Sequence, residues 1–593
     1  MVVVVTALTF LPVLENDFLN WDDVSNLLTN SNYRGLRWAN LRWMFTTMLG
    51  GHYIPLTWMS FGLNYLLGGL NPLGYHLGNL LLHTANAGLF YVVARRLLAA
   101  AFRGDGATTF PRAGERAGAD VALSVGGAFA AIIFGVHPLR VESVAWVTER
   151  RDVLCGLFYL VAALAYLRGV AGGARIESRW WVASLSAFLL ALLSKAAAMP
   201  LPAVLLLLDI YPLGRVHAVG WRRLLVEKAP YLLLAAGAAL VAVIAQSSAH
   251  ALTGYQRYGA GARVGMTTYA LMFYPWKFLW AADLSPLYEL PQTVDPLAWR
   301  FLFPTLALAV VTLALVAARR RCPGALVAWV YSALLALPVT GAVVHAGVQL
   351  VSDRYTYLSG LGFAVLAGGA LAWLLRQQGR FKASVVGAGV LVAVLVIVGW
   401  AASSWRQSKI WHDSETLWRR TLELDPGCAI CTINVGTALV AAPSSDAQRA
   451  PEAEALFRHA LMLRPDLVFA YHGLGVALAL QHRYDEAEAA FGEYIRREPG
   501  SALGRADLGV LRVEQRRYAE AILLLRQAFT MDPDLVEPRA DFVRALRERG
   551  EELRREGRSL EADALMAEAA ALEGKPPADA APTGQRSATT TVR

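Results

Sequence analysis

The sequence predicts an all-α protein in two parts, a polytopic helical membrane domain over residues 1–404 and an array of helical repeats over residues 405–573. Two observations support this division. Hydrophobic residues make up 56% of the 593 residues and charged residues only 17%, whereas soluble domains carry roughly 25% charge. The acidic and basic residues concentrate after residue 404, where prolines also recur at a regular spacing. One part is therefore built for lipid and the other for water.

The membrane part contains ten long apolar stretches, and a spanning helix needs about 20 largely apolar residues. They lie at about 76–94, 121–136, 153–168, 180–194, 198–213, 229–246, 301–318, 325–344, 357–375 and 383–402. Val2–Leu14 has no basic flank and no small-residue cleavage site, so we interpret it as a further, incomplete helix rather than a signal peptide. Segment 266–282 contains Pro275 and Lys277 and predicts an interfacial or re-entrant element. About 11 spans are expected.

Basic residues indicate the orientation of these spans. They gather in the loops at about 95–120, 168–179, 214–228, 319–323 and 376–382. Short cytoplasmic loops carry an excess of Lys and Arg, so we expect a cytoplasmic N-terminus and a repeat array outside the cytoplasm. The same loops account for the net charge of +9, and no nucleic-acid binding is expected.

The C-terminal part carries an internal repeat. Pro426, Pro465, Pro499 and Pro533 are spaced by 39, 34 and 34 residues, and 34 residues is the period of tetratricopeptide repeats. Within one repeat, Leu474-Gly475, Ala487 and Phe491 stand at the expected offsets. Glycine lets two helices approach closely, Ala and Phe fill the seam, and Pro ends the second helix. Residues 442–450 insert about five extra residues, and residues 574–593 predict a disordered tail.

The four cysteines give only a modest signal. Cys155 and Cys322 lie in or beside apolar segments and are predicted to be small buried hydrophobes. Cys428 and Cys431 form a lone C-x-x-C motif, which lacks a thioredoxin-like context and further zinc ligands. A local disulfide or two idle thiols remain as the alternatives.

Asn20-Trp21-Asp22-Asp23 is the first candidate site. Two adjacent carboxylates in extended chain cannot point the same way, so one can face a substrate while hydrogen bonds hold the other. A carboxylate beside an acceptor hydroxyl can take its proton as the hydroxyl attacks. The alternative is a solvated helix start, with Asp23 as its N-cap.

Three further polar clusters occur in apolar surroundings, where ionisable groups are costly. They are His137–Ser143 with Glu149–Asp152, the lone Lys195 after Ser194, and Asp353-Arg354-Tyr355. A Lys or an Arg at these positions can bind phosphate oxygens. The alternatives are a network of interfacial ion pairs for the first cluster and side chains that snorkel to the membrane surface for the other two.

Taken in order, these motifs resemble the transmembrane-and-TPR-containing O-mannosyltransferases, a family of GT-C glycosyltransferases. The resemblance rests on Phe18–Asp23, Pro55–Thr57, Asn64–Pro72, His76–His83, Val136–Pro138, Glu142–Ala145, Arg151–Leu154, Leu193–Lys195 and Asp353–Ser359, followed by the repeats. It covers most of the chain, and its specificity lies in the ordered set.

The resemblance implies inverting transfer of a sugar, mannose in the family, from a polyprenyl-phosphate carrier to a protein or envelope acceptor outside the cytoplasm. Asp22 or Asp23 would be the general base and Glu142 a second acid that orients the acceptor. Lys195 and Arg354 would hold the carrier phosphate, together with Arg140 and Arg151. No metal and no other cofactor is expected, because two cations can stabilise a departing phosphate in a poorly solvated site.

The resemblance also implies partners and a location. The repeat groove, with Tyr471 and Asn434, would bind the acceptor protein. The Ala- and Arg-rich composition indicates a bacterial chain, for which the carrier would be undecaprenyl phosphate and the location the inner membrane. Two other functions remain open: a non-catalytic membrane scaffold whose repeats recruit envelope proteins, and a lipid-linked-oligosaccharide ligase or polymerase that needs a metal.

Overall fold

A computed structural model of the chain describes residues 1–103, 113–171, 176–249, 252–253, 257–342, 345–377, 382–441, 448–533, 535 and 538–574. Parts of the predicted basic loops at 95–120, 168–179 and 376–382 lie outside the described residues. So do most of the predicted insertion at 442–450 and the predicted disordered tail after residue 574.

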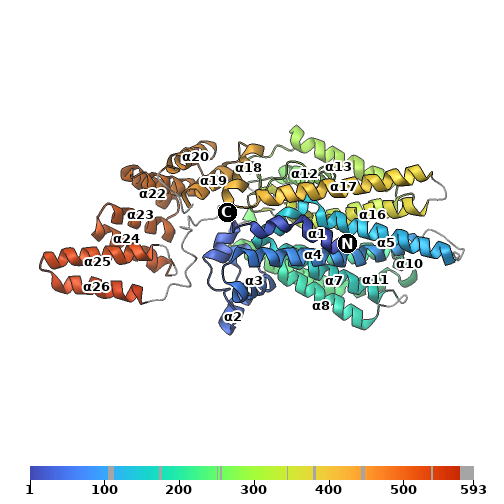
Figure 1. The fold of residues 1–593 in the computed structure, drawn as a ribbon, viewed down its shortest axis with the longest axis horizontal. Helices are drawn as coiled ribbons and strands as arrows, with labels where there is room; N and C mark the ends of the chain where they lie inside the picture. Colours follow the sequence, from blue (N-terminus) through green and yellow to red (C-terminus); the bar gives the residue numbers. More distant parts are fainter. Residues whose placement is uncertain are drawn as a thin grey trace. The chain divides into compact units, whose positions relative to one another are not determined.

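The chain forms two compact units (Figure 1). The membrane unit comprises Met1–Phe18 and Asn32–His412, and the array unit comprises Leu19–Ser31 and the described part of Asp413–Val592. The predicted boundary near residue 404 falls inside an unbroken helix, α17 (Ala383–Ile410). The division follows it, where Asp413 caps the next helix by accepting a hydrogen bond from the Thr416 amide at 2.8 Å. No local sequence pattern indicates that Leu19–Ser31 belongs with the array.

The membrane unit is helical throughout. Its helices are α1 (Val2–Thr9), α2 (Trp38–Thr46), α3 (Pro55–Gly68), α4 (Pro72–Arg103), α5 (Ala113–Val136), α6 (Val141–Ala145), α7 (Arg150–Gly169), α8 (Ser178–Ser194), α9 (Leu201–Ile210), α10 (Arg215–Val219), α11 (Trp221–Ser248), α12 (Ala260–Leu279), α13 (Trp299–Ala317), α14 (Pro323–Ala336), α15 (Thr356–Ser359), α16 (Leu361–Arg376) and α17. Two short antiparallel pairs join its loops, β1 (Leu252–Thr253) with β3 (His345–Ala346) and β2 (Tyr288–Glu289) with β4 (Gln349–Val351).

Six helices in the described residues are long and apolar enough to cross a membrane. They are Pro72–Phe102, Gly118–Val136, Val147–Gly169, Trp221–Ser248, Trp299–Ala317 and Ala383–Ile410, and a seventh candidate, Asp353–Ser359 with Leu361–Arg376, bends by 56° at its break. The expected number of about 11 spans is not confirmed. The predicted spans at 180–194, 198–213 and 325–344 are shorter apolar helices, and α1 has only 8 residues. The interfacial segment 266–282 lies mostly in α12, which is not among the six.

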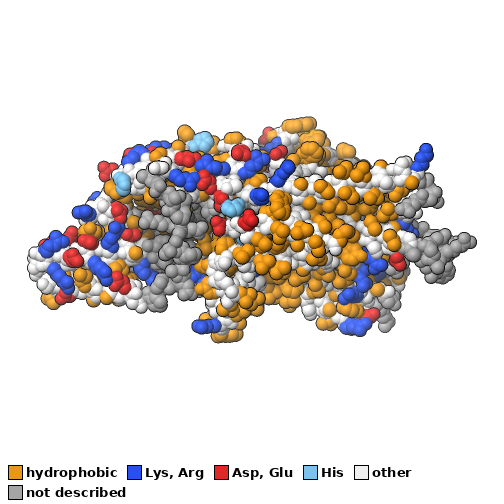
Figure 2. Space-filling view, in the orientation of Figure 1, with side chains coloured by type: hydrophobic (Ala, Val, Ile, Leu, Met, Phe, Trp, Pro, Cys, Tyr) orange, Lys and Arg blue, Asp and Glu red, His pale blue; other side chains and the backbone are white. Residues whose placement is uncertain are grey.

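The spanning helices divide into an inner and an outer set. Val147–Gly169 is 78% buried inside the unit, whereas Trp221–Ser248, Trp299–Ala317 and Ala383–Ile410 are at most 11% buried. Figure 2 shows hydrophobic side chains covering much of the visible surface of the membrane unit. Apolar side chains without protein neighbours are suited to contact with lipid. The multi-pass membrane character of the unit follows.

Small residues bring the inner helices together. A Cβ added at Gly126 of α5 would lie 2.5 Å from the Gly368 carbonyl oxygen of α16 and 2.7 Å from the Ala372 Cβ atom. The two backbones are therefore in direct contact. This kind of packing is how helices associate in lipid, where van der Waals contact replaces the hydrophobic effect.

The described array consists of a leading helix and four helix pairs, and it confirms the predicted repeats. The helices are α18 (Ser414–Leu424), α19 (Ala429–Ala441), α20 (Ala450–Leu463), α21 (Val468–Leu480), α22 (Tyr484–Arg497), α23 (Ala502–Glu514), α24 (Tyr518–Met531), α25 (Arg539–Arg555) and α26 (Ser559–Glu573). The predicted seam is present, since a Cβ at Gly475 would lie 2.6 Å from the Phe491 ring.

The cysteines divide between the two units. Cys428 and Cys431 form a disulfide at the start of α19, with a Cα–Cα distance of 5.3 Å. Cys155 is buried as predicted, but Cys322 is exposed. The prediction for Cys322 was wrong because this residue precedes Pro323, directly after the basic run Arg319–Arg321, where the apolar helix has not yet begun.

A buried carboxylate ties two repeats of the array together. Glu454 in α20 accepts hydrogen bonds from Gln481 Nε2 at 2.7 Å and from Arg483 Nη1 at 2.7 and 2.8 Å, and it also pairs with Arg458. Burial alone would raise the pKa of Glu454, but these hydrogen bonds and charges outweigh burial and lower the pKa. The ionised form therefore stabilises the folded array.

We predict that Glu454→Gln lowers the free energy of unfolding of the array by about 1.5–3 kcal/mol, the usual contribution of hydrogen bonds to a charged group. Because the folded pKa lies below the unfolded value of about 4.3, the native carboxylate stabilises above that pH and the difference between the two chains fades as the pH falls through the folded pKa. Hydrogen exchange of α20–α22 in the full-length native and variant chains, at pH 7 and pH 4, measures this difference in the free energy of unfolding. Equal protection of native and variant chains at pH 7 would contradict the prediction.

Candidate functional site

The membrane unit buries a cluster of charged side chains contributed by three segments. We call this the charged cluster, and it comprises Arg140, Glu142, Glu149, Arg151, Asp152, Lys195, Asp353 and Arg354. The sequence suggested that the loop after α5 carries its charges at a membrane surface. Residues 131–156 are buried in the protein throughout.

Local sequence explains how this loop folds inward. Pro138 ends the apolar helix α5, and the chain then forms short helical turns at Pro138–Arg140, α6 and Val147–Glu149 before α7 begins. His137 fixes the first turn, because its Nδ1 accepts a hydrogen bond from the Leu139 amide at 3.2 Å and its Nε2 lies 3.0 Å from the Phe278 carbonyl oxygen. Turns of this kind satisfy the backbone while they point several charged side chains to one side.

Glu149 is the centre of the charged cluster. Its Oε1 atom accepts from Arg151 Nη2 at 2.6 Å and forms an ion pair with Arg354 Nε at 3.2 Å, and its Oε2 atom accepts from Lys195 Nζ at 2.8 Å. The carboxylate is completely buried. Three cations from three segments therefore share one anion.

Lys195 lies at an extended break between α8 and the short turn Ala196–Ala198. Its ammonium group contacts Glu149 and also Asp152, where the Nζ–Oδ1 distance is 2.7 Å. The Lys195 side chain is 15% exposed, more than Arg151 at 5% or Arg354 at 9%. An ammonium group has three N–H donors, so one remains for a ligand after the two carboxylates are bound.

Arg354 and Glu142 bind one another. The Arg354 backbone amide donates to Glu142 Oε2 at 2.7 Å, and the guanidinium Nη1 donates to Oε1. The carboxylate of the neighbouring Asp353 accepts from the Tyr288 hydroxyl at 3.1 Å. Glu142 therefore positions Arg354. Its expected contact with an acceptor stays a prediction.

Arg140 differs from the other cations of the cluster. Its side chain is fully buried, and within the described residues none of its three guanidinium nitrogens has a hydrogen-bond partner. The guanidinium carbon lies 5.3 Å from the Phe134 ring centre and 5.6 Å from the Tyr357 ring centre. A buried guanidinium whose nitrogens have no hydrogen-bond acceptor is suited to bind an anionic ligand.

The cluster rests on a second layer of neutral groups. The Tyr357 hydroxyl lies 2.9 Å from His83 Nδ1 and accepts from Asn86 Nδ2 at 2.9 Å. His83 Nε2 is 3.0 Å from the Gly135 carbonyl oxygen, as expected for a hydrogen-bonded core histidine. These contacts fix the ring against which Arg140 packs.

Sequence reasoning gave no role to Glu149, Arg150 or Asp152. The signal was present, because Glu149 and Asp152 are three residues apart and such residues lie on one face of a helix. Arg150 points elsewhere and donates to Asn79 Oδ1 at 2.6 Å and to the Tyr75 carbonyl oxygen at 2.5 Å. It joins α7 to α4.

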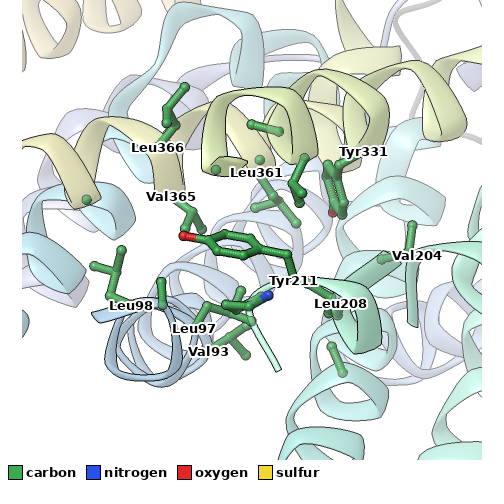
Figure 3. A pocket seen from close by; sticks show the side chains of 18 of the residues that line it. Val93, Leu97, Leu98, Val204, Leu208, Tyr211, Tyr331, Leu361, Val365 and Leu366 are labelled. Atoms are coloured by element: carbon green, nitrogen blue, oxygen red, sulfur yellow. The ribbon is translucent and has the colours of Figure 1, made fainter. Parts of the chain in front are cut away.

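An apolar pocket of about 290 Å³ lies among α4, α7, α9, α14 and α16 (Figure 3). Its walls include Val93, Leu98, Leu208, Tyr331 and Val365. Leu361 and Gly362 at the start of α16 also line it. Gly360, directly before Leu361, faces the Arg140 guanidinium, since a Cβ atom at Gly360 would lie 2.6 Å from Arg140 Nη2. The start of α16 thus contacts Arg140 through Gly360 and lines the pocket with Leu361 and Gly362.

Asp22 and Asp23 belong to the array unit, with the rest of Leu19–Ser31. Asp23 is fully buried, and its Oδ2 atom accepts from the Leu19 amide at 3.1 Å. Asp22 is partly exposed. The structure thus assigns the two neighbours different surroundings, while Glu142, Lys195, Arg354, Arg140 and Arg151 come together in the membrane unit.

The two residues predicted to bind an acceptor lie in different environments. Tyr471 is partly exposed on α21, with the Arg497 guanidinium 4.6 Å from its ring centre. Asn434 is 1% exposed, and its carbonyl oxygen accepts from Asn20 Nδ2 at 3.0 Å. Because Asn434 is buried in α19, its role in binding an acceptor stays a prediction.

The described residues contain no group of three or more His, Cys, Asp or Glu side chains placed to hold a metal ion. Glu142, Glu149 and Asp152 of the charged cluster form ion pairs with Arg or Lys side chains instead. The absence of a metal requirement stays a prediction.

Comparison with known proteins gives partial matches. No family model matches the chain. Protein O-mannosyl-transferase TMTC2 of Mus musculus is 35% identical over 167 residues, 27% of this chain and 17% of that protein. Protein O-mannosyl-transferase TMTC4 of Homo sapiens is 31% identical over 172 residues, 28% of this chain and 22% of that protein. The matches thus span about a fifth of the length of these relatives.

Solved structures are more distant. ArnT from Cupriavidus metallidurans bound to undecaprenyl phosphate has 15% identity and a TM-score of 0.33, over 76% of this chain and 79% of that chain. MamA from Desulfovibrio magneticus has 17% identity and a TM-score of 0.22, over 27% of this chain and 83% of that chain. Neither score is high enough to fix the helix arrangement. The resemblance that the motifs predict is confirmed at the level of sequence: over part of its length, the chain is similar to protein O-mannosyl-transferases.

Proposed function

We propose that the chain is a membrane glycosyltransferase. It transfers a sugar, mannose or another hexose, from a polyprenyl-phosphate donor to a protein Ser/Thr hydroxyl or another envelope acceptor outside the cytoplasm, with inversion at the sugar. The partial identity with protein O-mannosyl-transferases supports the reaction class. One observation carries the choice of donor: Arg140, whose guanidinium has no hydrogen-bond partner, and the apolar pocket both adjoin the start of α16 at Gly360–Gly362.

A lipid phosphate would compensate for the burial of the Arg140 guanidinium. A buried guanidinium without an acceptor costs several kcal/mol relative to water (order of magnitude). A phosphate monoanion or diester would offset this cost through charge-assisted hydrogen bonds. The adjacent pocket would take the isoprenoid chain, whose apolar surface gains by leaving water. A single ligand with an anionic head and an apolar tail satisfies both features.

Lys195 supplies the second cation for the same head group. Glu149 and Asp152 hold its ammonium group in place and leave one N–H donor for the phosphate. Negative charge grows on the carrier phosphate as the bond to the sugar breaks. Fixed cations in a water-poor site stabilise that charge without reorganisation, so the departing group needs no metal.

Asp22 is the proposed general base. It is partly exposed, whereas Asp23 is buried and closes the loop onto the Leu19 amide. The Asp22 carboxylate would take the proton of the acceptor hydroxyl as that oxygen attacks the sugar from the face opposite the phosphate. Inversion follows from one such displacement.

The proposed location is the inner membrane of a bacterium, with a cytoplasmic N-terminus and the array outside. The Cys428–Cys431 disulfide supports this side for the array, because disulfides persist in oxidising compartments. The array groove would present the acceptor protein.

We predict that Asp22→Asn lowers the rate of transfer by about 10²–10⁴-fold, the usual contribution of a general base. Membranes that contain native or variant chains at equal levels are supplied with polyprenyl-phosphate hexose, and hexose-sized mass increases of envelope proteins are followed by intact-mass spectrometry. Asp23→Asn is the matched neighbour and should change the hydrogen-exchange protection of residues 19–28 as well as the rate.

An unchanged rate in the double variant Asp22→Asn with Asp23→Asn would remove the first-loop carboxylates from the mechanism. If native membranes produce no mass increase at all, a non-catalytic scaffold becomes the better description.

A second prediction separates a ligand-binding arginine from a structural one. Arg140→Met should weaken the binding of polyprenyl phosphate by about 10–100-fold, which corresponds to the loss of one or two charge-assisted hydrogen bonds. It should not lower the stability of the membrane unit, because no protein group loses a hydrogen-bond partner. Arg354→Met removes one member of a buried ion pair and should destabilise by about 3–5 kcal/mol. Binding is measured by calorimetric titration in detergent and stability by thermal unfolding. Destabilisation by Arg140→Met with intact lipid binding would make Arg140 structural.

A further prediction concerns metals. Transfer in membranes washed with EDTA should proceed at the native rate, because the described cations already stabilise the leaving phosphate. The control is the same membrane with Mg²⁺ or Mn²⁺ restored. Loss of transfer in EDTA and recovery with metal would favour the oligosaccharide ligase or polymerase alternative.

A further inference from the structure

The first loop of the chain is folded onto the array. Residues Leu19–Ser31 belong to the array unit, while Met1–Phe18 and Asn32–His412 form the membrane unit. Within the membrane unit, the Asp17 amide donates to the His412 carbonyl oxygen at 2.8 Å. The chain therefore leaves the membrane unit for the first loop and for the array from two hydrogen-bonded positions.

Asn20 is fully engaged by the first array helices. Its backbone amide donates to Ser414 Oγ at 2.8 Å, and its Nδ2 atom donates to the Asn434 carbonyl oxygen at 3.0 Å. Its Oδ1 atom accepts from Trp418 Nε1 at 2.7 Å. Two array helices, α18 and α19, thus hold this single side chain and its backbone.

The rest of the loop is also ordered by specific contacts. The Trp21 ring lies 5.0 Å from the Trp418 ring, centre to centre. Asp23 binds the Leu19 amide, and Ser25 Oγ donates to the Asp22 carbonyl oxygen at 3.2 Å. Asp22 and Asp23 therefore directly follow Asn20 and Trp21, which contact the array. The bond from Ser25 to Asp22 is made within the loop itself.

We infer that the array positions the loop that carries the proposed base, with Asn20 and Trp418 as positioning residues. The inference rests on the proposed function. It changes the role of the repeats, because an array that only recruits an acceptor could be loosened without any effect on the chemical step. An array that holds the base loop would instead affect the chemical step itself. Misplacement of a reacting group by about 1 Å can cost about 10²-fold in rate.

The test compares two variants that break the anchor with one that weakens the array elsewhere. Asn20→Ala removes both side-chain hydrogen bonds, and Trp418→Phe removes the Nε1 donor but keeps a ring. Leu525→Ala, in the buried seam of α24, is the control, because its side chain lies in a different helix pair. The full-length chain is used in membranes with polyprenyl-phosphate hexose, and hydrogen exchange of residues 20–28 is recorded in parallel.

Asn20→Ala and Trp418→Phe should each lower turnover at saturating donor by about 10–100-fold. The donor concentration for half-maximal rate should stay within about twofold of native, since binding of the donor is untouched. Exchange of residues 20–28 should accelerate. In the double variant the two losses should be less than additive, because both remove the same hydrogen bond. Leu525→Ala should leave turnover and exchange of the loop at native values.

Three results would overturn the inference. They are faster loop exchange with native turnover, native loop exchange in both anchor variants, and an equal loss of turnover in Leu525→Ala. Failure of the proposed function is distinguishable, because the native chain itself would then show no transfer, or the Asp22→Asn variant would transfer at the native rate.

Discussion

The membrane unit depends on the sharing of one buried carboxylate among three cations. Glu149 binds Arg151, Lys195 and Arg354, and these residues come from the start of α7, the break after α8 and the turn before α15. A carboxylate taken out of water is very costly unless its charge and lone pairs are satisfied. The three segments must therefore converge for the unit to fold. Once they have converged, Lys195 is fixed with a free N–H donor and partial exposure, which is the form a phosphate-binding lysine requires.

Arg140 differs from the other cations of the charged cluster, because its guanidinium has no hydrogen-bond acceptor. Its neighbours in the cluster balance one another, whereas its own guanidinium lies among rings without an acceptor. It lies beside Gly360, and the next two residues, Leu361 and Gly362, line a pocket with apolar walls. Stability alone favours an apolar residue at such a position. A well-packed apolar side chain of similar volume leaves a protein as stable as a buried ion does, or more stable. An unpaired charge beside an apolar pocket is more readily explained by a ligand than by folding.

Periodic features of the fold could be predicted from the sequence, and long-range ones could not. The 34-residue spacing of Pro465, Pro499 and Pro533 locates the repeats because each repeat packs only on its neighbours. The expected number of spans is not confirmed, and hydropathy does not reveal helix breaks such as the one at Lys195. The residues of the charged cluster were largely found as motifs, but their pairing was not, since Glu142 and Arg354 are 212 residues apart. The attachment of Asn20 to the array also depends on contacts nearly 400 residues away in sequence, which no local pattern encodes.

The central claim is that the membrane unit holds a lipid phosphate between Lys195 and Arg140, and a structure of the ligand complex tests it most directly. The full-length chain in lipid nanodiscs would be imaged by electron cryo-microscopy with undecaprenyl phosphate and with an uncharged polyprenol of the same length. The account predicts phosphate density within hydrogen-bond distance of Lys195 Nζ and an Arg140 nitrogen, about 2.7–3.2 Å, with the isoprenoid chain in the α4–α16 pocket, and weak or displaced density for the polyprenol. Phosphate bound away from both cations, or a pocket that stays empty at saturating lipid, would contradict it.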